Sequence, residues 1–168
     1  MVIIGTSHLS AILPIVCIGV TLAASLHDIA ARTIPNSLAL ALGVAGIAIG
    51  TMHGYLFGSL FAAGSVFVFS AFCWRCGWMG GGDVKLIGAA ALGMPLSSVL
   101  TFVAAVAVAG GLLALLYLGA RHLVSAPAAL RPHGLLARAV RVERWRIRRG
   151  GPLPYACAIA GGFLFVIV

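Results

Sequence analysis

Long apolar stretches, separated by short polar breaks, dominate the chain. Six of them can be drawn, and they run over Leu9–His27, Pro35–Met52, Tyr55–Trp74, Val84–Met94, Pro95–Ala120 and Pro152–Val168. A helix needs about 20 apolar residues, and at least about 17, to cross a bilayer. Only the fourth stretch is clearly too short, so we expect it to be tilted, buried or extended across Pro95. The pattern predicts an all-α polytopic membrane protein with about six transmembrane helices.

The composition also indicates a membrane protein. Of the residues, 62% are hydrophobic and 8% are charged, and the mean hydropathy is +1.14. Soluble domains carry about 25% charged residues. So much apolar surface cannot be hidden in one core, and lipid has to cover part of it. We therefore expect residues 1–168 to form a single membrane-embedded domain.

Positive charge is concentrated in one region. Eight of the eleven Lys and Arg residues lie between Arg121 and Arg149, and the others are Arg32, Arg75 and Lys85. With six spans, all eleven fall on the same side of the membrane, and the opposite loops contain only His53. The positive-inside rule makes the basic side cytoplasmic, which puts both termini outside.

Within the basic region, Leu135–Arg149 has the pattern of an amphipathic helix. One face would carry Arg138, Arg141, Arg144 and Arg148, and another Leu135, Ala139 and Val142, with Trp145 beside them. This pattern predicts a helix that lies on the anionic inner leaflet. Nucleic-acid binding is disfavoured because the region has few aromatic residues and no recognised nucleic-acid fold.

The chain has only three acids, and two of them lie at the edges of apolar stretches. A carboxylate beside lipid is costly, so Asp28 and Asp83 are functional candidates. The six-span topology brings both to the cytoplasmic boundary. Two carboxylates that share a proton form an acid/base pair for peptide-bond hydrolysis. Glu143, the third acid, lies among arginines and is expected to pair with them.

Each aspartate also has a structural interpretation. Asp83 follows Gly80, Gly81 and Gly82, which we expect to unwind the backbone beside a cavity. It could instead be the N-cap of a helix that begins at Val84. Asp28 could pair with Arg32 one helical turn later. The spacing alone leaves these alternatives open.

Two other spacings favour structural roles. Cys73 and Cys76 form a lone CxxC motif without the further ligands that a zinc site needs, and no metal or cofactor is expected. Glycines recur every four residues at Gly46, Gly50, Gly54 and Gly58. Such spacing allows close helix packing, with a turn expected near His53 and Gly54.

Three motifs together resemble the type IV prepilin peptidase family. The run Gly80-Gly81-Gly82-Asp83, continued by Val84, Lys85 and Leu86, fits the GxGD signature of membrane-embedded aspartyl proteases. Asp28, followed by Arg32, Ile34, Pro35 and Asn36, resembles the first aspartate motif of the family. Pro154-Tyr155 and the residues up to Gly161 resemble a third block, in which this chain has Ala156 where Gly is frequent. The chain is most similar to the short Flp/Tad-type form.

The resemblance implies a function. Members of the family are aspartyl endopeptidases of the bacterial inner membrane that cleave the leader of prepilins or pseudopilins at the cytoplasmic face. Asp28 and Asp83 would be catalytic, and motif or substrate-binding roles would fall to Gly80, Gly81, Gly82, Lys85, Arg32, Pro35, Asn36, Pro154 and Tyr155. Arg32 and Lys85 would either anchor the cytoplasmic side or tune the charge of the aspartates. Longer members carry a cysteine-rich insertion and methylate the product, and no such activity is expected here.

Two other classes of function stay open. Intramembrane acids and broken helices also occur in ion- or proton-coupled transporters. The acids here lie at one face and no inverted repeat is evident, which favours the peptidase. A non-catalytic scaffold for pilus assembly is the other alternative. The oligomeric state is not predicted by the sequence.

Overall fold

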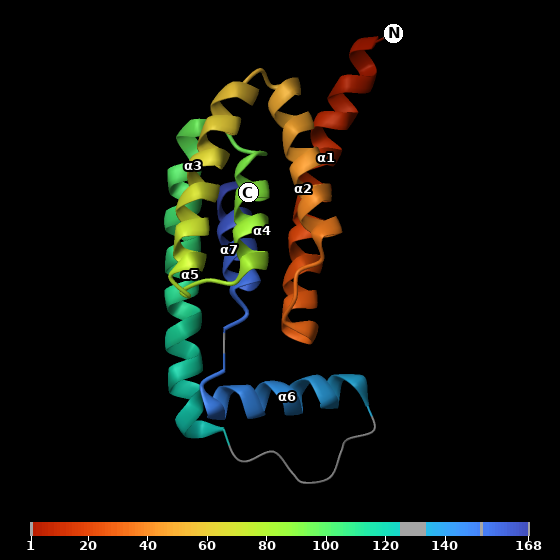
Figure 1. The fold of residues 1–168 in the computed structure, drawn as a ribbon. Coiled ribbons are helices and arrows are strands. Elements are labelled where there is room, and N and C mark those ends of the chain that lie inside the picture. The colour runs from red at the N-terminus through yellow and green to blue at the C-terminus, as the bar shows by residue number, and fades with distance from the viewer. Residues whose placement is uncertain (1, 125–133, 152, 168) are drawn as a thin grey trace.

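The computed structural model describes residues 2–124, 134–151 and 153–167, and within these residues it is all-helical (Figure 1). The seven helices are α1 (Val2–Ala31), α2 (Asn36–Met52), α3 (Leu56–Arg75), α4 (Gly81–Ala91), α5 (Leu96–Leu123), α6 (Leu135–Arg149) and α7 (Tyr155–Ile167). Six of them run along a common bundle axis, and α6 lies crosswise at one end of the bundle (Figure 1). The predicted all-α class is therefore confirmed.

Three of the described helices are long and apolar enough to cross a membrane. They are His8–Ala31 of α1, Leu56–Arg75 and Leu96–Leu123. The helices α2 and α7 are apolar but shorter. With 11 residues, α4 is about 16 Å long, which is too short to span a bilayer. The number of spans and the side on which the termini lie stay predictions.

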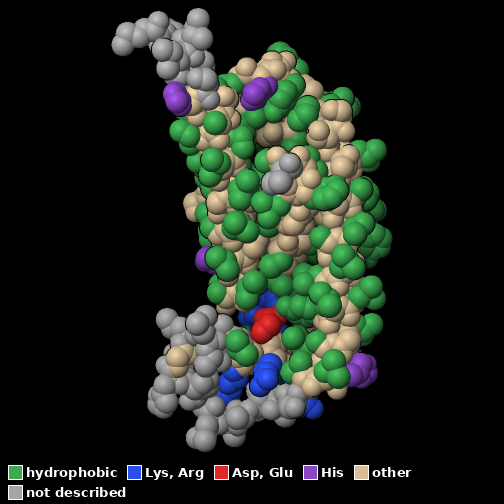
Figure 2. All heavy atoms as spheres, turned by 180° about the vertical axis from the view of Figure 1, so that it is seen from behind, with side chains coloured by type: hydrophobic (Ala, Val, Ile, Leu, Met, Phe, Trp, Pro, Cys, Tyr) green, Lys and Arg blue, Asp and Glu red, His purple; other side chains and the backbone are tan. Residues whose placement is uncertain are grey.

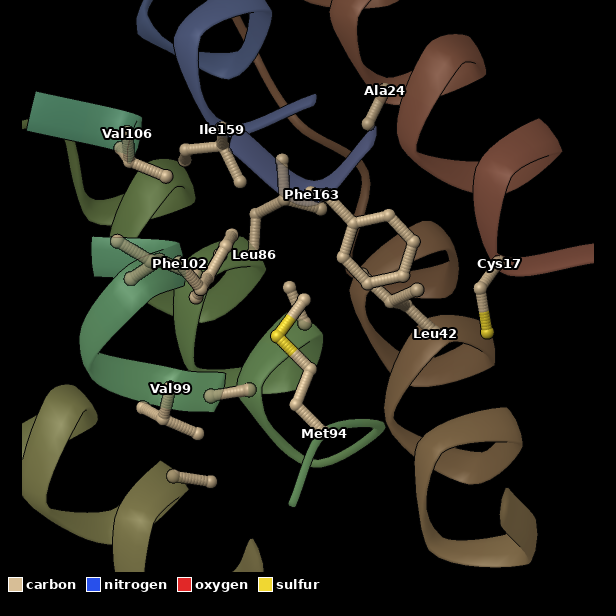
Figure 3. Close-up of a cluster of buried hydrophobic side chains, with 14 of the residues drawn as sticks. Cys17, Ala24, Leu42, Leu86, Met94, Val99, Phe102, Val106, Ile159 and Phe163 are labelled. Carbon is tan, nitrogen blue, oxygen red and sulfur yellow. The ribbon is translucent and has the colours of Figure 1, made fainter. Parts of the chain in front are cut away.

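The short helix α4 forms the centre of the bundle. It packs against α2, α3 and α7. Its side chains Leu86, Ile87, Ala90 and Ala91 are all buried. Leu86 lies in the same apolar cluster as Phe102 of α5 and Phe163 of α7, whose rings meet edge to face at 6.4 Å between centroids (Figure 3). A core of this kind holds the first turn of α4 in a fixed place.

The outer surface of the bundle is apolar. Phe57 is 88% exposed and Leu100 is 79% exposed, and hydrophobic side chains cover most of the face in Figure 2. Lys, Arg, Asp and Glu side chains gather at one end of that face. Contiguous apolar surface of this extent needs a nonaqueous partner, and lipid provides it. The protein is thus built as a membrane protein.

The expected close packing of glycines is present in α2. A Cβ atom at Gly46 would lie 2.8 Å from the backbone nitrogen of Gly93, so a side chain there would clash with backbone. Gly54 has φ +75° and lies in the turn between α2 and α3. The predicted turn at this position is therefore confirmed.

The predicted amphipathic helix is present as α6. Arg131 and the side chains of Leu135, Arg138 and Ala139 lie outside the described residues. Among the described residues, Val142 and Trp145 are about half exposed, and Arg144 and Arg148 are exposed. Arg149 stacks its guanidinium over the Trp145 ring at 4.3 Å.

Candidate active site

The structure brings the two aspartates together at the end of the bundle that α6 crosses. Asp28 lies in the last turn of α1, and Asp83 is the third residue of α4. Asp28 is only 8% exposed. The pKa of Asp83 is raised from 3.8 to about 6. Burial is the larger cause, and the negative charge of Asp28 is the second. The two carboxylates are thus close enough for the charge of one to affect the other.

The glycines before Asp83 do not unwind as expected. Gly80 is the N-cap of α4, with φ −74° and ψ 145°, and the helix begins at Gly81. The interpretation of Asp83 as the N-cap is wrong, since its carboxylate reaches back from inside the first turn to accept a hydrogen bond from the Gly80 N–H. An acid at the third helical position often satisfies this N–H in the same way.

The three glycines before Asp83 lie so close to neighbouring side chains that there is little room for a side chain of their own. A Cβ atom at Gly80 would lie 2.8 Å from Asp83 Oδ2. At Gly82 it would lie 3.1 Å from the Ile34 side chain, and at Gly81 3.3 Å from Trp74 Nε1. The glycines therefore let the start of α4 approach both α3 and the connection between α1 and α2.

The start of α7 completes the surroundings of Asp28. The backbone N–H of Ala156 donates to the Asp28 carboxylate. Ser25, one turn before Asp28, donates its hydroxyl to the Ala156 carbonyl at 3.0 Å. The block that begins at Pro154 and Tyr155 is thus placed beside the first aspartate. Ser25 was not predicted as part of the site, and its position one turn from Asp28 was the signal that could have indicated it.

Arg32 does not form the expected ion pair with Asp28. Its Nη2 donates instead to Glu143 Oε1 of α6 at 3.0 Å. Among the described residues, the ion pairs are those of Glu143 with Arg32 and with Arg146. The predicted ion pair of Arg32 with Asp28 is therefore wrong, although the charge of Arg32 still acts on Asp28 from a distance. Arg32 also has φ +56°, a left-handed conformation that is uncommon outside glycine.

Glu143 is paired within the arginine-rich region, as predicted, and it is also tied to the rest of the bundle. Arg146 Nη1 donates to Glu143 Oε2 at 3.1 Å and to the Ile29 carbonyl at 2.9 Å. The hydroxyl of Tyr117 on α5 donates to Glu143 Oε1. These bonds connect α6 to α1 and α5. Sequence reasoning did not indicate Tyr117 or Arg146, because their contacts depend on where α6 lies.

Lys85 is directed toward α2. Its Nζ donates to Asn36 Oδ1 at 2.9 Å, and Pro35 is the residue that precedes α2. No described acid lies within ion-pair distance of Lys85. Among the cations, Arg32 acts on Asp83 by lowering its pKa, against the larger effects of burial and of Asp28. The observed contact favours a role for Lys85 in joining α4 to the start of α2.

An apolar cavity of about 500 Å³ lies beside the site. It runs between α3, α4 and α5, and Tyr155 of α7 also contributes to its wall. Ile87, one turn after Asp83, and Met79, next to Gly80, line it as well. Cys73 lines the cavity and Cys76 is exposed, both as free thiols. Among the described residues, no three His, Cys, Asp or Glu side chains gather as a metal site.

Comparison with protein families identifies a match for most of the bundle. A family model described as the type IV leader peptidase family matches residues 15–115, which is more than half of the chain. The match includes Asp28 and Asp83 and ends before α6. No curated protein and no solved structure matches the chain.

Proposed function

The chain belongs to the type IV leader peptidase family, and on that basis we propose that it is a membrane-embedded aspartyl endopeptidase. Family membership makes it a leader-peptidase-like protease. The aspartyl mechanism is supported by one observation, which is that the carboxylates of Asp28 and Asp83 lie at the same end of the bundle and interact. Glu143 is not available for the same role, because both of its oxygens are engaged by Arg32, Arg146 and Tyr117.

In this mechanism the two aspartates share one proton. One carboxylate is ionised and removes a proton from the attacking water, while the other is protonated and polarises the scissile carbonyl. Repulsion between the two charges favours the singly protonated pair, and the pair titrates with two macroscopic pKa values. The raised pKa of Asp83, about 6, is consistent with a carboxyl group that holds a proton near neutral pH.

The proposed substrate is the leader peptide of a Flp-like prepilin. The positive-inside rule supports a position of the end with Arg32, Arg146 and Arg149 at the cytoplasmic face of the bacterial inner membrane. Cleavage would take place there. The connection between α1 and α2 is short, spanning residues 32–35, and has no cysteine-rich insertion. We therefore propose peptidase activity without N-methylation.

The apolar cavity supports a substrate with an apolar segment next to the cleavage site. On α3 its lining runs from Phe61 to Cys73, which is roughly 18 Å of helix. One end of the cavity reaches Met79 and Tyr155 beside the aspartates. We propose that the apolar segment of the prepilin lies along this cavity while the leader reaches the cytoplasm.

The partner of α6 would be the anionic inner leaflet. Val140, Val142 and Trp145 are each about half exposed, and exposed arginines lie on the same helix. Apolar side chains beside arginines suit the boundary between acyl chains and headgroups. This contact would hold α6 across the end of the bundle that bears the aspartates.

Leader cleavage tests the proposal directly. The native chain, Asp28→Asn and Asp83→Asn are each co-expressed with a Flp-type prepilin, and the loss of the leader is followed as a gel shift. We expect cleavage by the native chain and none by either variant, although both insert in the membrane. Thr51→Ala, at an exposed position at the opposite end of the bundle, is the control that keeps cleaving. Cleavage by both Asn variants at the native rate would refute the aspartyl mechanism, and no cleavage by the native chain would refute the substrate.

A further inference from the structure

Arg32 lies between two acids, either of which could hold its charge. It follows Asp28 by four residues, the spacing at which side chains on a helix meet. Its backbone N–H donates to the Asp28 carbonyl at 2.8 Å, so the two residues are joined through the last turn. The Arg32 side chain nevertheless turns to Glu143, and its Nε and Nη1 are buried without a hydrogen-bond partner in the described structure.

Glu143 is well placed to hold Arg32. Its carboxylate is fixed from two other directions, by the Tyr117 hydroxyl of α5 and by the neighbouring Arg146. The side chains of Arg32 and Glu143 are 15% and 19% exposed, so water screens their attraction only in part. The pair therefore joins α1 to α6 with a defined geometry.

We propose that Glu143 is a positioning residue of the peptidase, which keeps the Arg32 guanidinium from forming an ion pair with Asp28 and so leaves Asp28 able to share a proton with Asp83. The inference rests on the proposed function. It gives α6 a part in the chemistry although none of its side chains touches the reacting atoms. It also explains why an arginine follows the aspartate by one turn without forming an ion pair with it.

The charge of Arg32 already acts on Asp28 from a distance, although the two residues form no ion pair. The other groups that interact electrostatically with Asp28 are Asp83 of α4, Glu143 and Arg146 of α6, and Cys157 of α7. Arg146 is already engaged by Glu143 and by the Ile29 carbonyl. Arg32 has the buried side-chain N–H groups, Nε and Nη1, that lack a hydrogen-bond partner among the described residues. An ion pair of Asp28 with Arg32 would engage them.

Removal of the Glu143 charge leaves a partly buried guanidinium without its acid, which is costly. Asp28, in the last turn of the helix that Arg32 follows, is then the acid with which it can pair. An ion pair there favours the doubly ionised state of the aspartates, which lacks the proton needed to polarise the scissile carbonyl. The upper pH limit of cleavage would move to lower pH, and the rate above that limit would fall about tenfold for each pH unit of the move.

The test compares Glu143→Gln with two double variants, which have the same net charge as each other. Glu143→Gln should cleave the prepilin at least several-fold more slowly at pH 8, with its upper pH limit lowered. Adding Arg32→Gln should raise cleavage above that of Glu143→Gln, because the competing cation is gone. Adding Arg75→Gln, at an exposed position at the end of α3, should not raise it. Thermal unfolding in detergent verifies that each variant is folded.

A second variant keeps the negative charge. Glu143→Asp should cleave faster than Glu143→Gln, and it serves also if the Gln variant does not insert. The proposal is overturned if Glu143→Gln matches the native chain in rate and pH profile. It is equally overturned if Arg32→Gln fails to rescue Glu143→Gln, since Glu143 would then only hold α6 in place.

A chemical readout separates this inference from the proposed function. A diazo reagent esterifies protonated carboxyl groups, and mass spectrometry locates the label on Asp28 without any need for cleavage. We expect less labelling of Asp28 in Glu143→Gln than in the native chain, and recovery in the double variant with Arg32→Gln. Unchanged labelling would overturn the inference even if the peptidase function holds, and the expected labelling would support it even if the substrate is a different one.

Discussion

At the scale of single residues, Asp83 combines an ionisable group with a site that disfavours its charge. Burial and then the charge of Asp28 raise its pKa from 3.8 to about 6, while Gly80 and Arg32 act in the opposite direction. A functional group held in this way reduces the stability of the folded protein, as is common in active sites. The structure supports Asp83 through the core of α4 rather than through an ion pair.

This arrangement predicts that Asp83→Asn stabilises the protein in a pH-dependent way. The folded state binds the Asp83 proton more tightly than the unfolded chain, so the native protein loses stability as the pH rises from 3.8 through about 6. The variant has no such loss, and its advantage should be small at pH 4 and full at pH 8. Thermal unfolding in detergent at the two pH values measures the difference. An equal advantage at both would contradict the prediction.

At the scale of helices, backbone contacts decide how α5 and α7 fit together. A Cβ atom at Gly162 of α7 would lie 2.5 Å from Val106 Cγ2 and 2.8 Å from the Val106 backbone nitrogen of α5. The backbone cannot move away without separating two helices that are packed along their length. Gly162 is therefore a position at which even a methyl group is too large.

We expect Gly162→Ala to lower the free energy of unfolding by about 1–3 kcal/mol, as overpacking of a core does. The matched control is Gly111→Ala on α5, where an added Cβ meets nothing within 4 Å. Unfolding in denaturant measures both. An unchanged stability of Gly162→Ala would show that α7 adjusts its position more freely than the contact distances indicate.

The sequence predicted the positions of the helices better than it predicted the contacts between them. Apolar length and amphipathic spacing identified α1, α3, α5 and α6, because those signals are local. The start of α4 was misplaced by three residues, since the core holds Gly81 and Gly82 in a helix despite their low propensity. The proximity of Asp28 and Asp83 was predicted, because a charge beside lipid is rare and the expected topology brought both to one end. The pair of Arg32 and Glu143 joins residues 111 apart, and no periodicity gives the placement of α6.

At the scale of the whole molecule, charge and apolar surface are separated along the bundle axis. The charged side chains gather at the end with α6, and the remaining surface is mainly hydrophobic (Figure 2). Cys76, at the end of α3, is an exposed thiol. Thr51 is exposed at the other end of α2. These two positions can report on which side of the membrane each end of the bundle lies.

We expect Cys76 to react with a membrane-impermeant maleimide in inverted inner-membrane vesicles but not in intact spheroplasts. The measurement uses a chain in which Cys17, Cys73 and Cys157 are replaced by alanine. Thr51→Cys, in a background that also lacks Cys76, should give the opposite pattern. Labelling of Cys76 from the outside would show that the aspartates face the periplasm and would refute cleavage at the cytoplasmic face.

The apolar cavity gives a further prediction for the assembled molecule. Ala107→Trp on α5 fills part of the cavity wall and should raise the KM for a prepilin with its apolar segment. It should leave cleavage of a short soluble leader peptide unchanged, because that peptide has no segment to place there. Ala104→Trp, an exposed position on the same helix outside the cavity lining, is the matched control. Equal effects of the two tryptophans would contradict the proposed path of the substrate.

The contact between α1 and α7 has a consequence for how the enzyme is made. Ser25 donates a hydrogen bond to the carbonyl of Ala156, which lies 131 positions later in the chain. The backbone N–H of Ala156 also donates to the Asp28 carboxylate. A ribosome that has synthesised α1 to α6 has therefore produced both aspartates but not the backbone that holds the first of them. We expect the nascent chain to be inactive until α7 has been made and packed against α1. Such an order would keep the growing protein from cutting its neighbours during insertion.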